Sequence, residues 1–252
     1  MDVDIETLAR YPTNSDDWIV TVAIGGIALL FSFLIVPWFI VSGYMIRAIR
    51  AGMDRAEQPP AFDEWGNLLK EGVVAGIIGL IYQLIPLLVF FVVVGGSFLA
   101  FLSGSDAGAG LGLFGFLGGM FLSWILAILF AYIGLAGIAN YAREGTFGAG
   151  FDFGVITDVI TSRDYLIAWG YVIALNIVVG VIITVLNIVP FLGAIVGVFV
   201  GFYSLIIAAW LWGERIRGNN RIETAAAYIH PRGSIRQSWP IQTIVEQMGT
   251  DR

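Results

Sequence analysis

Four long stretches of this sequence contain no charged residue, and they constrain the fold more than any other feature. They extend over residues 18–46, 72–105, 107–142 and 165–213. A helix needs roughly 20 mainly apolar residues to cross the hydrocarbon of a bilayer, where every backbone polar group must be bonded within the protein. Hydrophobic residues make up 58% of the chain and charged residues only 13%, which is far from the composition of a soluble domain. The sequence therefore predicts an all-α, polytopic transmembrane helical bundle with short amphipathic interfacial helices.

We expect about five spans, within a range of four to six. The last charge-free stretch is long enough for two spans, because Pro190 interrupts the backbone hydrogen-bond ladder there. The expected spans are about 18–46, 73–101, 113–142, 165–187 and 191–213. Together they form a transmembrane domain at 18–213, between an acidic N-terminal tail at 1–17 and a cytoplasmic C-terminal tail at 214–252.

The distribution of Lys and Arg predicts how the bundle is oriented, because cytoplasmic loops of membrane proteins are enriched in these residues. With the N-terminus outside, twelve of the thirteen basic residues fall on the inner side and only Arg10 falls outside. This predicts a multi-pass protein of the cell membrane with its N-terminus outside and its C-terminus cytoplasmic. A competing interpretation puts both termini inside, with residues 3–11 as a short interfacial helix and Pro37 breaking the first stretch into a re-entrant element.

Two expected inner loops each carry an aspartate ahead of an amphipathic segment. Asp63 precedes residues 65–70, and Asp152 precedes residues 153–163. We expect each aspartate to cap a short helix by accepting hydrogen bonds from free backbone N–H groups, and each helix to lie in the headgroup plane. The order of span, loop, amphipathic helix and span thus occurs twice. It is consistent with an internal duplication, and equally with the amphipathic turns that any polytopic protein carries at its interfaces.

The expected spans contain no Asp, Glu, Lys, Arg or His. A charge at the bilayer centre costs about 2.5–3.5 kcal/mol on insertion scales and is retained mainly for pathways and relays. The sequence therefore argues against proton-coupled transport and intramembrane metalloprotease chemistry. Gln83, Asn140 and Asn176 remain as candidates for a neutral polar pathway, although hydrogen bonding between helices is the simpler interpretation of these residues.

Glycines at four-residue spacing mark candidate contacts between helices. Gly193, Gly197 and Gly201 fall on one side of the last expected span, and Gly72 and Gly76 on one side of the second. Small residues at this spacing allow two helix backbones to approach closely. We expect these glycines to pack helices within the subunit, or to mediate dimerisation.

Charge and residue usage narrow the expected partners. The net charge of −6 and the pI of about 4.7 argue against nucleic acid as a partner. The chain has no cysteine, which excludes disulfides, iron–sulfur clusters and thiolate zinc sites. One lysine, Lys70, stands against twelve arginines, a usage that suggests a halophilic archaeon or simply GC-rich codons. We expect no cofactor and no metal, and we expect the lipid bilayer as a partner together with another protein or a second copy of the chain.

A group of motifs in the first half of the chain resembles a known family. The motifs are Tyr11-Pro12 shortly before Trp18, Gly43-Tyr44-x-x-Arg47, the Pro-x-Phe-Asp-x-Trp-Gly run at 60–66, and Gly72 at the start of the next span. With them, the chain resembles the uncharacterised prokaryotic integral membrane family catalogued as domain of unknown function 4013 (DUF4013), over roughly residues 5–215. The resemblance implies a small multi-span archaeal or bacterial membrane protein. It implies no activity and no catalytic residue.

The sequence is most consistent with a non-enzymatic membrane protein, either a scaffold or an accessory subunit of a membrane complex. The alternative is a transporter or channel for a small neutral or lipid-like solute, which would rest on Gln83, Asn176 and the repeated order of elements. A membrane enzyme acting on lipids would need acids or bases near an interface. Its candidates are Asp63, Glu64, Asp152 and Asp158, and helix capping already explains two of them.

Overall fold

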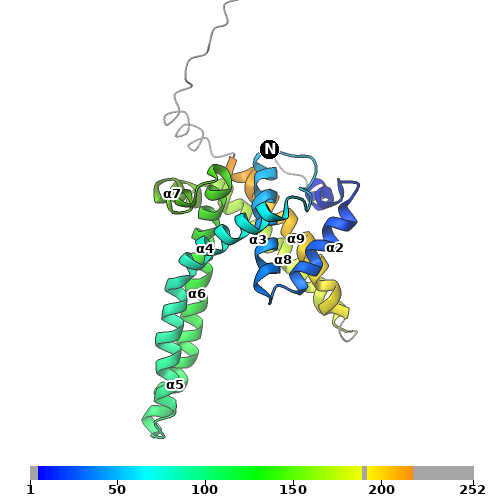
Figure 1. Cartoon of the computed structure of the whole chain (residues 1–252). Coiled ribbons are helices and arrows are strands. Elements are labelled where there is room, and N and C mark those ends of the chain that lie inside the picture. Colours follow the sequence, from blue (N-terminus) through cyan, green and yellow to red (C-terminus); the bar gives the residue numbers. More distant parts are fainter. Residues whose placement is uncertain (1–4, 189–191, 218–252) are drawn as a thin grey trace, which may run out of the picture. The chain divides into compact units, whose positions relative to one another are not determined.

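The structure is a computed structural model, and it describes residues 5–188 and 192–217 (Figure 1). The expected break at Pro190 and the expected tail beyond residue 217 lie outside these residues. Helices make up 86% of the described chain, and no strand occurs in it. The expected all-α fold is confirmed.

The described elements follow one another in a simple order along the chain. They are α1 (Ile5–Arg10), η1 (Tyr11–Thr13), α2 (Trp18–Leu30), α3 (Ile35–Met53), α4 (Trp65–Val89), the π-helix η2 (Phe90–Val94), α5 (Gly95–Phe101), α6 (Asp106–Glu144), η3 (Phe147–Phe151), α7 (Phe153–Ile160), α8 (Arg163–Leu186) and α9 (Leu192–Arg217).

Four helical segments of the described chain are long and apolar enough to cross a membrane. They are Trp65–Phe101, Asp106–Glu144, Arg163–Leu186 and Gly193–Arg217. The first joins α4, η2 and α5 and runs antiparallel to α6. With 37 and 39 residues, these two segments are each about 55–60 Å long at 1.5 Å per residue. This exceeds the hydrocarbon thickness of about 30 Å, so the pair must tilt strongly or extend beyond the hydrocarbon.

The first charge-free stretch forms two helices and differs in this from the single span expected at 18–46. α2 has 13 residues, about 20 Å, and α3 starts after a turn at 31–34 with Pro37 in its first turn. Proline fits there because first-turn N–H groups have no partner within the helix. The Tyr11 hydroxyl donates to the Gln58 carbonyl at 3.0 Å, so the segment before α2 lies beside the loop after α3. α2 and α3 thus form a helical hairpin whose turn lies at 31–34, before the Pro37 break of the re-entrant interpretation.

α3 packs closely against its neighbours through paired glycines. A Cβ atom added at Gly43 of α3 or at Gly72 of α4 would lie 1.9 or 1.7 Å from a carbonyl oxygen of the other helix. At Gly52 of α3 and Gly213 of α9 the corresponding distances are 2.0 and 1.9 Å. Direct backbone contact of this kind requires glycine, so these four positions hold α4 and α9 against α3.

Candidate functional site

Helices α3, α4 and α6 line an apolar groove of about 550 Å³, which we call the main groove. Trp38 of α3, Gly76 and Gly79 of α4, and Gly134 of α6 are among its lining residues. Of the three glycines, only Gly79 faces open space, because a Cβ atom added there would be 3.8 Å from its nearest neighbour, whereas at Gly76 and Gly134 it would press against aromatic side chains. The volume of the main groove falls within the range of roughly 300–1,000 Å³ that is usual for small-molecule sites.

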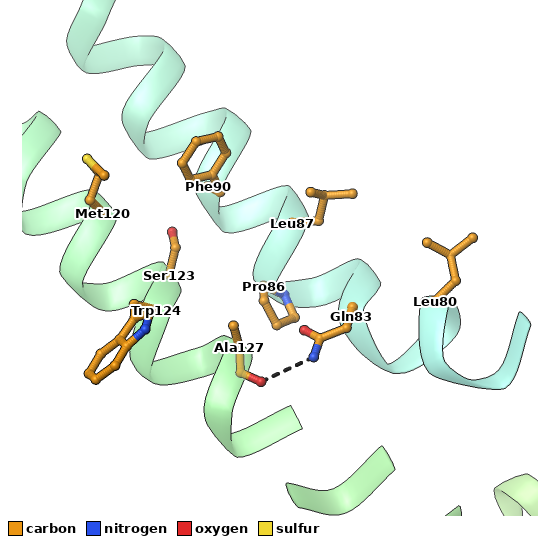
Figure 2. A pocket seen from close by; sticks show the side chains of 9 residues that line it. All are labelled: Leu80, Gln83, Pro86, Leu87, Phe90, Met120, Ser123, Trp124 and Ala127. Atoms are coloured by element: carbon orange, nitrogen blue, oxygen red, sulfur yellow. Dashed lines mark hydrogen bonds between the residues drawn. The ribbon is translucent and has the colours of Figure 1, made fainter. Parts of the chain in front are cut away.

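A second apolar groove of about 430 Å³, the hairpin groove, lies between α6 and the α4–η2 segment (Figure 2). It shares Leu80 and Gln83 with the main groove, so the two adjoin along the same pair of helices. Gln83 stands at the junction, where its Nε2 donates to the Ala127 carbonyl of α6 at 3.2 Å. This is a hydrogen bond between helices, the simpler of the two interpretations expected for Gln83.

The hairpin groove contains few polar atoms. Ser123 lines it with 6% of its surface exposed, and its Oγ has no hydrogen-bond partner among the described residues. Ser42 and Ser97, by contrast, donate to carbonyls of their own helical segments at 2.9 and 2.6 Å. Pro86 also lines the groove, and because proline has no N–H, the carbonyl one turn earlier in α4 receives no helical hydrogen bond from it.

η3 closes the interface of α4 and α6 at the end nearest the loops. The Tyr82 hydroxyl of α4 donates to the Gly150 carbonyl at 2.8 Å, and Asn140 Nδ2 of α6 donates to the Ala149 carbonyl at 2.8 Å, both in buried surroundings. A Cβ atom at Gly137 of α6 would lie 2.5 Å from the Gly150 oxygen, so the η3 backbone touches α6. Irregular backbone is tolerated at membrane depth when its polar groups are bonded in this way.

Beyond the main groove, a charged cluster joins three helices. Arg50 of α3 donates from Nε to the Ala142 carbonyl of α6 at 2.7 Å and forms an ion pair with Glu71 of α4, whose side chain is 19% exposed. Glu71 lies one turn before Ala75, and Ala142 one turn after Ile138, and both Ala75 and Ile138 line the main groove. The cluster therefore sits one helical turn past the loop-side end of the groove.

A second charged cluster, at the end of α9, holds helix ends together. Glu214 pairs with Arg55 at 3.7 Å, and Arg215 pairs with Asp164 at the start of α8 at 3.8 Å. The side chains of Glu214 and Arg215 are both largely buried. Sequence reasoning missed these residues and the Arg50–Glu71 pair. The sequence feature that could have indicated them is position, because Glu71 and Glu214 directly flank charge-free stretches.

The structure does not bring the three candidates for a polar pathway together. Asn140 lies 13 residues beyond Ala127, the partner of Gln83, which is about 20 Å along α6. Asn176 is exposed on α8, and its Nδ2 donates to the Val172 carbonyl of its own helix at 2.8 Å. Gln83 thus links α4 to α6, and Asn140 links α6 to η3 at a separate level along α6.

The glycines expected to pack helices differ in how closely they do so. Gly72 touches the α3 backbone, and Gly76 lies under aromatic side chains of α3. A Cβ atom at Gly193 would meet a side chain just after α8 at 2.5 Å. At Gly197 and Gly201 it would lie 3.4 and 3.6 Å from side chains of α8 and α2, which is ordinary van der Waals contact.

The two aspartates expected to cap interfacial helices have different partners. Asp152 Oδ1 accepts from the backbone N–H groups of Gly154 and Val155 at 3.1 and 3.2 Å, at the start of α7. Asp63 instead forms an ion pair with Arg47 of α3. The segment 65–70 that follows it is not a separate helix but the first turns of α4.

No group of three or more acidic, histidine or cysteine side chains is placed to hold a metal ion in the part of the chain that the structure describes. The main groove and the hairpin groove are lined mainly by apolar side chains, with a few neutral polar ones among them.

Comparisons with known proteins identify the family of the chain. A family model described as "Protein of unknown function (DUF4013)" matches residues 26–188. The "Uncharacterized protein MJ1189" of Methanocaldococcus jannaschii is 30% identical, in an alignment that covers 71% of this chain and 69% of that protein. No solved structure matches the chain.

Proposed function

We propose that this chain, which belongs to the family described as "Protein of unknown function (DUF4013)", is a non-enzymatic membrane protein that binds a lipid-like molecule in the main groove. The observation that carries the proposal is the groove itself, an apolar space of about 550 Å³ between membrane-spanning helices. Exposed apolar side chains such as Leu80 and Leu84 surround it, so the medium that fills it is the bilayer. An occupant drawn from that medium has an alkyl or isoprenoid chain.

Several charged residues near the loops support a non-enzymatic role, because they make structural contacts. Arg50 and Glu71 bind three helices together, and Asp152 caps α7. Asp63 is paired with Arg47, and Glu64 lies within 3.6 Å of the same guanidinium group. A lipid-processing enzyme would need at least one acid or base free to act on a substrate.

A scaffold or accessory subunit is the second candidate, and α8 favours it. Only 11% of the apolar window of this span is buried, and it packs mainly against α9. Asn176 and Gly170 are exposed on α8, where another protein or a second copy would cover a polar amide otherwise facing lipid. Purification in a mild detergent tests this candidate. A stoichiometric partner lost on Asn176→Leu supports it, and an unaltered monomer opposes it.

The geometry also supports an orientation different from the one expected from five spans. Tyr11 lies beside the loop after α3, and Arg217 at the end of α9 donates to the Met53 carbonyl at 2.8 Å. With the N-terminal segment on the loop side, every described Lys and Arg lies at one face, and Asp106 is the only described charge at the other. We infer from the enrichment of Lys and Arg in cytoplasmic loops that this face is cytoplasmic.

An archaeal, salt-adapted source is also part of the proposal. The relative from Methanocaldococcus jannaschii supports an archaeal source. Salt adaptation rests on composition alone, on the acidic net charge and the single lysine.

Photo-cross-linking in liposomes tests the binding function. A diazirine-bearing hexadecane probe is expected to form adducts on the segments of α3, α4 and α6 that line the main groove. Gly79→Leu should fill the groove and abolish these adducts. A Cβ atom at this position would be 3.8 Å from its nearest neighbour, so a larger side chain has room to enter the groove. Gly118→Leu is the matched control, because nothing lies within 4 Å of its position on α6. Equal labelling of the two variants would refute the proposal.

A further inference from the structure

The hairpin groove holds a buried hydroxyl that lacks a partner among the described residues. Ser123 Oγ lies on the side of α6 that faces α4 and η2, and the groove is otherwise lined almost entirely by apolar side chains (Figure 2). Leaving such a group unbonded in an apolar setting is unfavourable, and serines in helices ordinarily avoid this by bonding a carbonyl of their own helix. Ser42 and Ser97 do so in this chain, whereas Ser123 does not.

Gln83 brings further polar atoms to the same groove. One N–H of its amide donates to the Ala127 carbonyl, and the amide retains a second N–H and its own oxygen. The groove therefore offers both donors and acceptors, all of them uncharged and within a few residues of one another along α4 and α6.

The depth of these groups limits the kind of ligand that they can meet. Gln83 is 12 residues from Glu71 along α4, and Ser123 is 17 residues from Asp106 along α6. These separations correspond to at least about 18 Å of helix. A charged group drawn to this depth would have no counter-charge and would be strongly disfavoured. An uncharged hydroxyl or carbonyl would find a partner here.

We propose that the hairpin groove recognises the single uncharged oxygen function, a hydroxyl or a carbonyl, of a neutral lipid whose chain extends into the main groove. The inference rests on the proposed lipid-binding function and names the chemical class of its ligand. Ser123 Oγ and the Gln83 amide form the hydrogen bonds, and Leu87, Phe90, Met120 and Trp124 surround the adjacent carbon chain. The main groove supplies affinity for the chain, and Ser123 and Gln83 supply the preference for its polar group.

Competition between two ligands of equal chain length tests the inference on the full-length protein in liposomes. A diazirine-bearing hexadecanol is cross-linked in the presence of unlabelled hexadecanol or hexadecane, and adducts on the segment 116–127 are quantified by mass spectrometry. We expect the wild type to prefer hexadecanol about 5- to 30-fold, the effect of one or two hydrogen bonds satisfied in an apolar site. A diacylglycerol competitor separates a two-chain membrane lipid from a single-chain alcohol as the source of the oxygen function.

Three variants show which residues produce the preference. Ser123→Ala and Gln83→Leu are expected to bind both ligands equally, whereas Ser97→Ala, whose hydroxyl is bonded within its own helical segment, should keep the wild-type preference. If Ser123→Ala and Gln83→Leu still prefer hexadecanol while Gly79→Leu abolishes adducts in the main groove, the inference fails and the proposed function stands. If neither groove of the wild type is labelled, both fail.

Discussion

The hydroxyl of Tyr82 on α4 donates a buried hydrogen bond of 2.8 Å to the carbonyl of Gly150 in η3, 68 residues further along the chain. The ring of Tyr82 also lines the main groove and stacks on Phe151, with ring centroids 5.6 Å apart. One side chain thus forms part of the groove wall and holds the segment that closes the loop-side end of the α4–α6 interface. Tyr82 therefore contacts both the main groove and η3.

Replacing Tyr82 by phenylalanine should loosen η3. The variant leaves the Gly150 carbonyl buried without this donor, at a cost of about 1–3 kcal/mol in the free energy of unfolding. Hydrogen exchange of the backbone amides at 147–151 is expected to accelerate, and denaturant titration in detergent should show the lower stability. Phe151→Leu removes the stacked ring but keeps the hydroxyl, so it should accelerate this exchange less. Unchanged exchange in Tyr82→Phe would show that the hydrogen bond does not hold η3.

Much of the fold could be predicted from the sequence, because an uncharged stretch of sufficient length has few options in a membrane. The expected spans at 73–101 and 113–142 lie within apolar helices of the structure, and the expected span at 165–187 ends one residue beyond α8. The first stretch was ambiguous, because its 29 residues suit either one tilted span or two short helices. In the structure Tyr11 bonds the loop after α3, and no local pattern in the sequence reports contacts between distant residues.

The candidate site was harder to predict for the same reason. Gln83 stood out because a polar residue in a span is rare, yet its partner is a backbone carbonyl of α6, which has no signature in the sequence. Ser123 looked like any other serine in a span, and only the helix arrangement shows that its hydroxyl is unbonded. The spacing of the glycines was also an incomplete guide. A four-residue pattern indicates a helix face made of small residues, but it does not indicate which helix packs against that face.

Two glycines of α9 should differ in their sensitivity to replacement by alanine. A Cβ atom at Gly213 would lie 1.9 Å from the Ile49 carbonyl oxygen, so Gly213→Ala must push α9 away from α3, with a loss of about 1–3 kcal/mol in stability. Gly197→Ala places its Cβ at an ordinary distance of 3.4 Å and should change stability by less than about 1 kcal/mol. Thermal unfolding in detergent compares the two. Equal effects would mean that the contact between α3 and α9 is looser than the structure indicates.

Alkaline pH should weaken the attachment of the N-terminal segment. Burial raises the pKa of Tyr11, which lies in η1 outside the spans. The neutral phenol is therefore favoured in the folded protein, and its contribution to stability is complete below the unfolded pKa of about 10 and is lost as the pH rises from there toward the folded value. Ultraviolet absorbance titration should show a late phase of tyrosine ionisation, and Tyr11→Phe should lower the amplitude of this phase by one tyrosine. An unchanged titration curve for the variant would contradict the assignment.

Single-cysteine labelling should distinguish the hairpin of α2 and α3 from a full span, and the native chain contains no cysteine to interfere. Thr13 and Gly148 are exposed at the face that carries the loops, whereas Ser103 is exposed in the turn between α5 and α6. We expect Thr13→Cys and Gly148→Cys to react with a membrane-impermeant maleimide from the same side of sealed vesicles, and Ser103→Cys to react from the other. Labelling of Thr13→Cys from the side of Ser103→Cys would mean that the first charge-free stretch crosses the membrane. That result would restore the outside N-terminus and separate Tyr11 from its contact with the Gln58 carbonyl.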